Sequence, residues 1–242
     1  QPDFGSALIF LSFIFVLYRE GLNPNFIFFL AISLVLALFS LIKPFFYVSV
    51  FLTGVFACFY FLSKKINKKV SIIPLVTAFI SSCIYVYSIN YIYNDLLSQR
   101  HKDRIDIFLG KETDIMGVGY NLNQSIIAIG SGGLSGKGYL QGTQTKGRFV
   151  PRQHTDYIFS TIGEEWGFYG TSIIIILFAT LVLRILFRAE HQKNIFGRSY
   201  AYGTASLIFM HFLINVGMSI GLVPTIGIPL PFISYGRSSM FT

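Results

Sequence analysis

The chain has 242 residues, of which 53% are hydrophobic and only 12% are charged, and its mean hydropathy is +0.61. Soluble domains carry about 25% charged residues, so the composition excludes an ordinary soluble domain and indicates an integral membrane protein. The formal charge of +8 does not indicate nucleic-acid binding, because the positive residues fall mainly in short loops between apolar runs. That distribution is typical of the cytoplasmic loops of membrane proteins.

Six apolar segments predict membrane-spanning helices, because about 20 apolar residues cross the ~30 Å hydrocarbon layer. They are residues 4–18, 25–42, 45–62, 70–93, 157–183 and 199–221. A seventh helix is expected to begin near Ser234. The predicted fold is an all-α polytopic membrane protein with four spans in 1–93, a large loop at 94–156, and two spans plus the start of a third in 157–242. Because the chain opens with Gln1 rather than Met and stops in what reads as the first turn of another helix, we expect a piece of a longer protein.

The basic loops predict the orientation of these spans. Residues 64–69 hold four lysines, and residues 184–198 hold three arginines and one lysine against a single glutamate. Two predicted helices separate these loops, so both lie on the same side, and the positive-inside rule makes that side cytoplasmic. The large loop at 94–156 is therefore predicted to be extracytoplasmic.

The large loop is rich in glycine, which permits positive φ and close backbone approach. It lacks the G-x-x-x-x-G-K-[ST] pattern of a P-loop, because Ser131 and Gly138 stand where that motif needs glycine and a hydroxyl residue. Residues 124–130 are apolar and can form a helix. We therefore expect part of the loop to dip into the membrane or lie on its surface, as backbone that lines a cavity can.

Asp156 is the most informative single residue, because it stands where the large loop meets an apolar run. One interpretation is helix capping, since Thr155 or Asp156 precedes a helix start. The other is a functional carboxylate, and the residues alone do not decide between them. Glu164 and Glu165 lie about two turns further in, ~12 Å for Glu164 at 1.5 Å per residue, where an ionisable side chain is a functional hypothesis by default.

Two later features carry polar groups or helix breakers. His211 and Asn215 are four residues apart on one helix face, and such groups are expected to join helices. Residues 221–236 contain three prolines, so they cannot form a continuous helix. This segment is a candidate for a broken element that lines a cavity.

Four stretches resemble the SEDS family of membrane glycosyltransferases, which polymerise lipid II into peptidoglycan strands. They are QPDFGS (1–6), NQSIIAIGSGGLSGKGYLQGTQ (123–144), RQHTDYIFSTIGEEWGFYG (152–170) and GIPLPFISYG (227–236). The GSGG and GTQ elements are more similar to the branch that serves cell elongation and shape than to the division branch. Residues 25–93 resemble the family only in being hydrophobic.

The resemblance implies a polytopic helical fold in the bacterial plasma membrane, with Asp156 as the catalytic aspartate. The matched motifs nominate substrate-binding residues: Gln124, Ser131, Lys137, Gln144, Arg152, His154 and Thr155. They also nominate Asp3, Glu164 and Glu165 as cavity residues. The expected partners are lipid II, a class B penicillin-binding protein and other membrane proteins of the elongation complex. Mg²⁺ is a candidate cofactor, although the sequence offers no dedicated site for it.

Two departures from the family pattern stand out. The family usually has one helix between the QPD-led helix and the large loop, whereas this chain has three, so an added pair is expected within 25–93. The family usually reads SYGGSS where this chain reads SYGRSS, which places Arg237 before the last helix. Two other functions remain open at this point: a flippase for a lipid-linked precursor, and a non-catalytic scaffold of the elongation complex.

Overall fold

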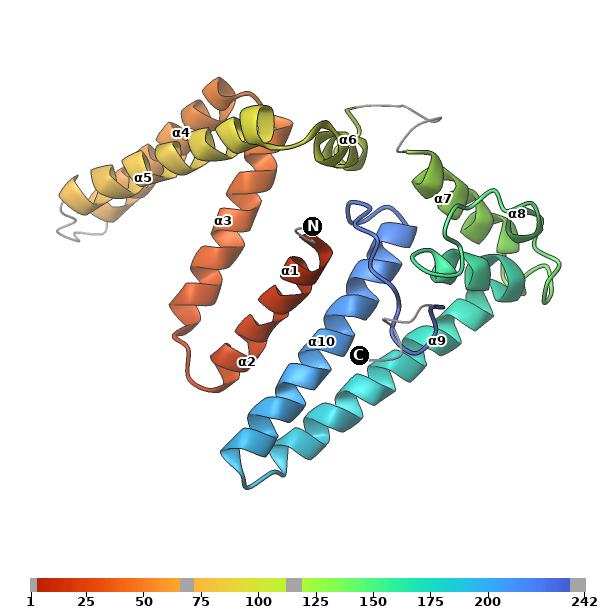
Figure 1. The fold of residues 1–242 in the computed structure, drawn as a ribbon. Coiled ribbons are helices and arrows are strands. Elements are labelled where there is room, and N and C mark those ends of the chain that lie inside the picture. Colours follow the sequence, from red (N-terminus) through yellow and green to blue (C-terminus); the bar gives the residue numbers. More distant parts are fainter. Residues whose placement is uncertain (1–3, 66–71, 112–118, 236–242) are drawn as a thin grey trace. The chain divides into compact units, whose positions relative to one another are not determined.

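The computed structural model describes residues 4–65, 72–111 and 119–235, and the described residues form helices and connecting loops (Figure 1). The chain divides into two compact units. One comprises Gln1–Asn23 and Asp103–Thr242, and the other comprises Pro24–Lys102. The described residues end at Tyr235, so Arg237 and all but the first two residues of the seventh helix expected from Ser234 lie outside them.

Among the described residues, five helices are long and apolar enough to cross a membrane. They are Pro24–Ile42, Phe45–Leu62, Ile72–Leu96, Ile158–Glu190 and Ile195–Ser219. The prediction of six spans is therefore correct for five, while the sixth segment forms the shorter apolar helix Gly5–Arg19. The predicted all-helical, multi-pass architecture is confirmed for the part of the chain that the structure describes.

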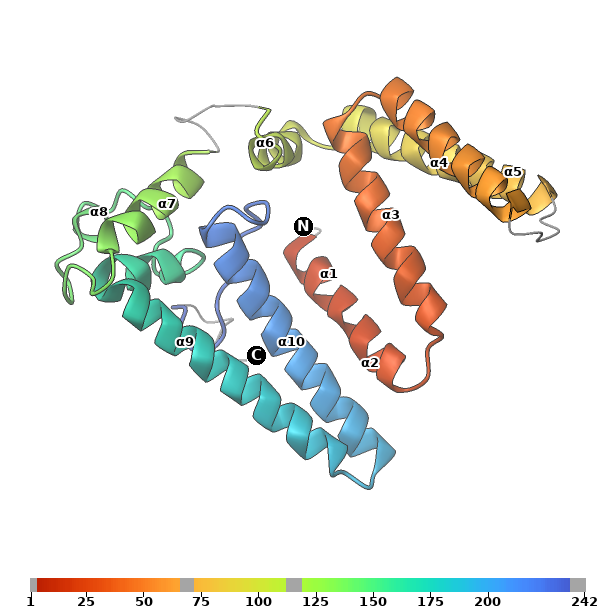
Figure 2. The same cartoon turned by 180° about the vertical axis from the view of Figure 1, so that it is seen from behind.

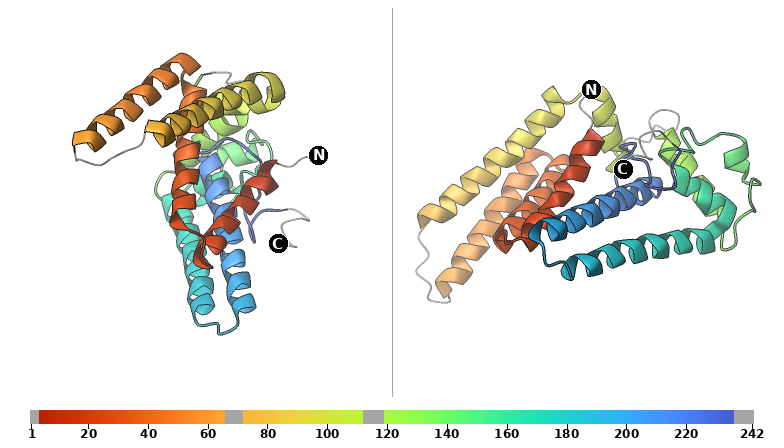
Figure 3. Two further views of the ribbon diagram at one scale, coloured as in Figure 1. Left: turned by 90° about the vertical axis from the view of Figure 1, so that its left-hand side faces the viewer. Right: turned by 60° about the horizontal axis from the view of Figure 1, so that its bottom comes forward.

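The unit Pro24–Lys102 contains α3 (Pro24–Ile42), α4 (Phe45–Lys65), α5 (Ile72–Tyr91) and the π-helical turn η2 (Ile92–Leu96). Both views in Figure 3 show α4 and α5 side by side. The core of this unit is small and consists of Val48, Leu52 and Val86. Most other apolar side chains of these helices are exposed, as expected for surfaces that face lipid.

The other unit is built around an antiparallel hairpin of α9 (Ile158–Glu190) and α10 (Ile195–Ser219). Asn194 begins α10, because its side-chain oxygen accepts a hydrogen bond from the Phe196 amide, the usual role of Asn at an N-cap. Phe178 stacks on Phe212 with 4.8 Å between ring centroids. Seen from behind, α1 (Phe4–Phe10), η1 (Leu11–Phe13) and α2 (Ile14–Arg19) run along α10 (Figure 2).

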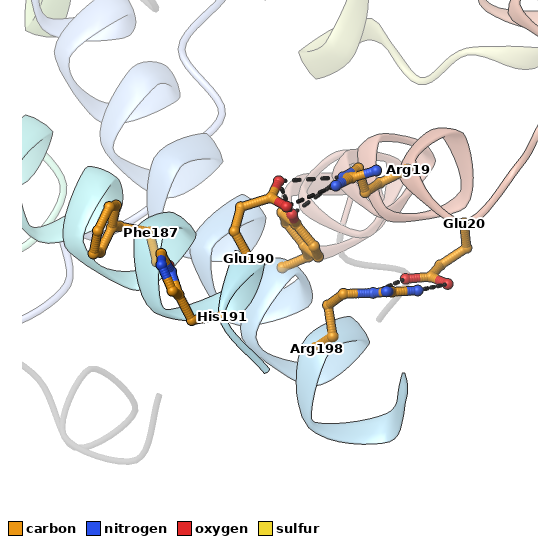
Figure 4. A network of polar contacts seen from close by, with 7 residues as sticks. Arg19, Glu20, Phe187, Glu190, His191 and Arg198 are labelled. Atoms are coloured by element: carbon orange, nitrogen blue, oxygen red, sulfur yellow. Dashed lines mark hydrogen bonds and ion pairs between the residues drawn. The ribbon is translucent and has the colours of Figure 1, made fainter. Parts of the chain in front are cut away.

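Two ion pairs connect the end of α2 to the α9–α10 turn (Figure 4). The Arg19 Nη2 atom lies 2.7 Å from Glu190 Oε2, and the Tyr202 hydroxyl also donates to Glu190. The Arg198 guanidinium donates to both carboxylate oxygens of Glu20, at 3.1 and 2.9 Å. These contacts hold three helix ends together at one end of the unit.

Three shorter helices precede α9: α6 (Gln99–Phe108), α7 (Tyr120–Gly132) and α8 (Thr143–Lys146). The helix expected at 124–130 is therefore confirmed. α7 packs against α9, and α8 follows the glycine-rich loop. The segment after α10 leaves the helix at Ile220 and shows no regular helix as far as Tyr235, in agreement with its prolines.

Candidate functional site

Residues 151–157 form a tight turn that ends where α9 begins. The amides of Thr155 and Tyr157 both donate to the Arg152 carbonyl oxygen, at 3.1 and 3.3 Å. Tyr157 is the N-cap residue of α9, and no side chain caps this helix end. The Thr155 hydroxyl instead donates to Arg152. The capping interpretation of Thr155 and Asp156 is therefore wrong, and the Asp156 carboxylate is not needed to begin the helix.

The Asp156 side chain lies in a nearly closed position, since the residue is 9% exposed. Its Oδ2 atom accepts a hydrogen bond from Arg152 Nη1 at 3.4 Å, and the Arg152 side chain is 74% exposed. Gly227, with φ +83°, also lies against this oxygen, since an added Cβ would be 3.1 Å from Oδ2. The Oδ2 atom is therefore next to the exposed guanidinium of Arg152 and to glycine backbone.

Three consecutive carbonyl groups of the turn are anchored, two by the end of the described chain and one by α10. The Tyr235 amide donates to the His154 oxygen at 2.8 Å, and the Ser234 hydroxyl donates to the Thr155 oxygen at 2.6 Å. The Asn215 side chain donates to the Asp156 oxygen at 2.8 Å. The proline-rich segment after α10 therefore packs directly on the turn that carries Asp156, about 60 to 80 residues earlier in the chain.

A second part of the site forms where α9 is interrupted at Gly167, whose φ is +63°. The loop after α7 enters this break and completes its hydrogen bonding. The amides of Lys137 and Gly138 donate to the carbonyls of Glu164 and Glu165, both at 3.0 Å. On the far side, the amides of Phe168 and Tyr169 donate to the carbonyls of Gly133 and Leu134, at 2.9 and 3.1 Å.

This insertion requires close backbone contact. A Cβ on Gly132 would lie 1.9 Å from the Gly163 carbonyl oxygen, and a Cβ on Gly136 would lie 2.1 Å from the Glu165 oxygen. Real side chains cannot occupy either position unless the backbone moves. The dense glycines of the loop therefore serve its fit into α9.

Glu164 is fully buried at the centre of this second part. Among the described residues its carboxylate accepts five hydrogen bonds, from Lys137 Nζ, the Thr143 hydroxyl, the Gln144 amide, and the amide and hydroxyl of Thr145. The distances run from 2.7 to 3.2 Å. The carboxylate thus binds the amides of α8 and neutralises Lys137, and no acceptor site on it is visibly free for substrate.

The two parts of the site are connected through Gln153, which is buried. Its Nε2 atom donates to the Thr145 carbonyl at 3.2 Å and lies 3.3 Å from His154 Nε2. A continuous chain of contacts therefore runs from Glu164 through Thr145 and Gln153 to the turn that carries Asp156.

The other nominated residues are distributed around these two parts. Arg152, His154 and Thr155 stand beside Asp156, whereas Lys137 and Gln144 join Glu164. Gln124 and Ser131 lie on α7, where the Ser131 hydroxyl donates to the Ala128 carbonyl of the same helix. Glu165 is buried and forms no ion pair with any described residue. Asp3 lies outside the described residues.

Comparisons with known proteins identify the family of this chain. Residues 23–242 match the cell cycle protein family that groups FtsW, RodA and SpoVE. The chain belongs to this family.

Two relatives give the extent of this similarity. Peptidoglycan glycosyltransferase MrdB of Escherichia coli is 42% identical over 145 residues, covering 60% of this chain and 39% of MrdB. Peptidoglycan glycosyltransferase RodA of Treponema pallidum is 34% identical over 264 residues, covering 100% of this chain and 61% of RodA. The chain therefore spans less than two thirds of the length of these relatives.

A solved structure shares the fold of this FtsW/RodA/SpoVE family member. It comes from a peptidoglycan synthase complex that coordinates polymerization and crosslinking, with a TM-score of 0.58 and 23% sequence identity. The match covers 99% of this chain and 52% of the solved one.

The donor set around Asp156 does not fit a dedicated Mg²⁺ site. The partner of this carboxylate is the Arg152 guanidinium rather than a second carboxylate. The described residues contain no group of three or more His, Cys, Asp and Glu side chains that could hold a metal ion.

Sequence reasoning missed three residues that shape this family member's site: Gln153, Gly227 and Ser234. Each acts on a partner that is distant in sequence or through its backbone, so no local pattern marks it. All three lie within stretches that resemble the SEDS family (152–170 and 227–236), and the prolines between 224 and 231 indicated a non-helical segment, but neither signal says what these residues contact.

Proposed function

We propose that the full-length protein is a RodA-like peptidoglycan glycosyltransferase that polymerises lipid II into glycan strands for cell elongation. Family membership supports this, as do the names of the relatives from E. coli and T. pallidum. The observation that carries the proposal is the Asp156 carboxylate, nearly buried in an anchored turn at the start of an apolar helix. At this position a proton acceptor lies at the boundary between a polar loop and an apolar helix, which suits a substrate with polar sugars and a lipid tail.

The proposed reaction is a single inverting displacement. Lipid II carries an α-linked disaccharide on undecaprenyl pyrophosphate, and the glycan product is β-1,4-linked. The 4-hydroxyl of the acceptor sugar gives its proton to Asp156 while its oxygen bonds to the anomeric carbon of the donor. The bond from that carbon to the lipid pyrophosphate breaks, and the electron pair leaves with the pyrophosphate. Asp156 must approach within about 2.6–3.2 Å of the hydroxyl oxygen.

The leaving pyrophosphate needs positive charge close by. Arg152 is our first candidate, because its exposed guanidinium is joined to Asp156 by one contact of 3.4 Å and can move toward an anion. Lys137 is a weaker candidate, because Glu164 and Thr143 already hold its ammonium group. Lys146 and Arg148 are exposed on the same loop and are further candidates.

The proposed reaction implies a place for the protein in the cell and a protein partner. We propose that the protein lies in the bacterial plasma membrane with residues 94–156 on the extracytoplasmic side, which agrees with the basic loops at 64–69 and 184–198. A class B penicillin-binding protein is the proposed partner. The fold match to a complex that coordinates polymerization with crosslinking supports this choice.

One reconstitution separates polymerase from flippase and scaffold. The full-length protein is placed in liposomes with fluorescent lipid II, and both glycan length and transbilayer movement of the lipid are measured. We expect a ladder of glycan products. Lipid movement without polymer would favour a flippase, and neither activity, alone or with the transpeptidase partner, would favour a scaffold.

A further inference from the structure

Asn215 of α10 lies beside the turn that carries Asp156 but is not among the groups that the proposed reaction employs. Its side chain is fully buried, and Nδ2 donates to two carbonyl oxygens, Asp156 O at 2.8 Å and Ile228 O at 2.7 Å. Its Oδ1 atom has no hydrogen-bond partner among the described residues. The orientation of the amide follows from its surroundings, because a flipped amide would turn its oxygen toward two carbonyl oxygens.

The unpaired Oδ1 has a cost, since a buried polar atom without a partner is unfavourable. An apolar residue of similar size would avoid that cost but would supply no donor. Asparagine therefore serves this position by supplying the two N–H donors of its side-chain amide.

The two carbonyls that Asn215 holds belong to Asp156 and to the segment that faces the Asp156 carboxylate. One is the carbonyl of Asp156 itself. The other belongs to Ile228, the residue after Gly227, and Gly227 lies against Asp156 Oδ2. One side chain therefore fixes both the aspartate and the backbone that faces it.

Asn215 is itself held from behind. Its carbonyl accepts a hydrogen bond from the Ser219 hydroxyl at 2.8 Å, and the Ser219 carbonyl accepts one from Ser125 of α7, also at 2.8 Å. All three residues are fully buried. Hydrogen bonds therefore connect Asn215 through Ser219 to α7.

We propose that Asn215 is a positioning residue, which sets the place of the Asp156 carboxylate relative to Gly227 without touching substrate. This inference rests on the proposed function, because it presumes that Asp156 accepts the proton. A general base works only within hydrogen-bond reach, and a misplacement of 1 Å can cost about 100-fold in rate. The expected effect of losing the anchor is on kcat rather than on KM.

The test uses the full-length protein with Asn215→Leu, which keeps the side-chain size and removes both donors. Asn215→Ala is made in parallel in case the leucine variant does not fold, and folding is checked by thermal unfolding and size-exclusion chromatography. We expect kcat for lipid II polymerisation to fall about 100-fold with KM within about twofold. The control on the same helix is Thr204→Val, which removes a hydroxyl that donates to the Tyr200 carbonyl within α10 and should leave kcat near the wild-type value.

A double variant shows whether Asn215 acts through Asp156. Adding Asn215→Leu to Asp156→Asn should lower the residual rate no further, because effects of groups that act as a unit are not additive. A folded Asn215 variant with wild-type kcat would overturn the inference. Failure of the proposed function itself looks different: the wild type would form no polymer, or Asp156→Asn alone would retain full activity.

Discussion

Glu164 shows how much of this site one buried carboxylate organises. We expect Glu164→Gln to lower the free energy of unfolding by about 3–5 kcal/mol, the usual cost of removing one partner of a buried ion pair. The reason is that Lys137 and the amides of Gln144 and Thr145 lose a charged acceptor. Thermal or denaturant unfolding in a fixed detergent measures the change.

Glu165→Gln is the matched control, because Glu165 is adjacent and also buried but has no ion pair among the described residues. It should cost clearly less than Glu164→Gln. Adding Lys137→Met to Glu164→Gln should cost less than the sum of the single changes, since the pair is in direct contact. Equal losses for the two glutamates would contradict the central role of Glu164.

At the residue scale, the sequence identified Asp156 but could not describe its surroundings. Capping and catalysis stayed open because both place an aspartate before a helix, and only the observed helix start at Ile158 removed the first. Asn215 was predicted to join helices, and it joins α10 to a turn and a loop instead. Its partners lie 59 residues before and 13 residues after it, beyond the reach of any local pattern.

At the scale of elements, the inserted loop after α7 gives a direct test. Gly132→Ala should destabilise the protein by about 3 kcal/mol, because overpacking of this size usually costs 1–3 kcal/mol and the added Cβ would meet backbone at 1.9 Å. The loss should appear as a lower unfolding temperature. It should be accompanied by weaker polymerisation, since the loop holds Lys137.

Gly130→Ala is the control for this change, two residues earlier on the same helix. An added Cβ there meets nothing within 4 Å, and alanine is the better helix former by about 1 kcal/mol. The variant should be as stable as the wild type or slightly more so. If both substitutions behave alike, the account of the loop insertion fails.

The elements themselves were largely predictable, because hydropathy depends only on local composition. The break in α9 was not. Residues 157–183 predicted one continuous span, whereas Gly167 interrupts the helix and residues 133–138 complete its hydrogen bonds. A helix break whose backbone groups are hydrogen-bonded by a distant segment does not change the apolar pattern of the helix, so hydropathy cannot predict it.

At the scale of the whole molecule, the ion pairs at the end of α2 tie the first helices to the α9–α10 hairpin. Hydrogen bonds from Arg198 lower the pKa of Glu20 below its ordinary value of 4.5. A carboxyl group whose pKa is lower in the folded state than in the unfolded state stabilises the fold at pH values above its unfolded-state pKa. This stabilisation is lost as the pH falls through the folded-state pKa. Glu20→Gln should therefore lower the unfolding temperature slightly at pH 7, and the difference from wild type should shrink below about pH 4.5. A difference that does not change with pH would contradict this tie.

The three-helix unit Pro24–Lys102 is the other large-scale feature. Hydropathy predicted its three helices, and the structure has all three. The resemblance suggested one helix at this place. The alignment with T. pallidum RodA runs through the whole chain, so the departure is not a reason to separate this unit from the family.

The central claim is that Asp156 accepts the proton in glycan polymerisation. The most direct measurement compares purified full-length wild type with Asp156→Asn on lipid II, with Asp106→Asn as a control for loss of a carboxylate elsewhere in the same loop. Amide nitrogen and oxygen have nearly the shape of the carboxylate but cannot act as a base at neutral pH. We predict a loss of about 100-fold or more for Asp156→Asn, since general-base catalysis contributes about 10²–10⁴-fold, with unfolding temperature and substrate binding retained. A wild-type polymerisation rate in folded Asp156→Asn would contradict the account.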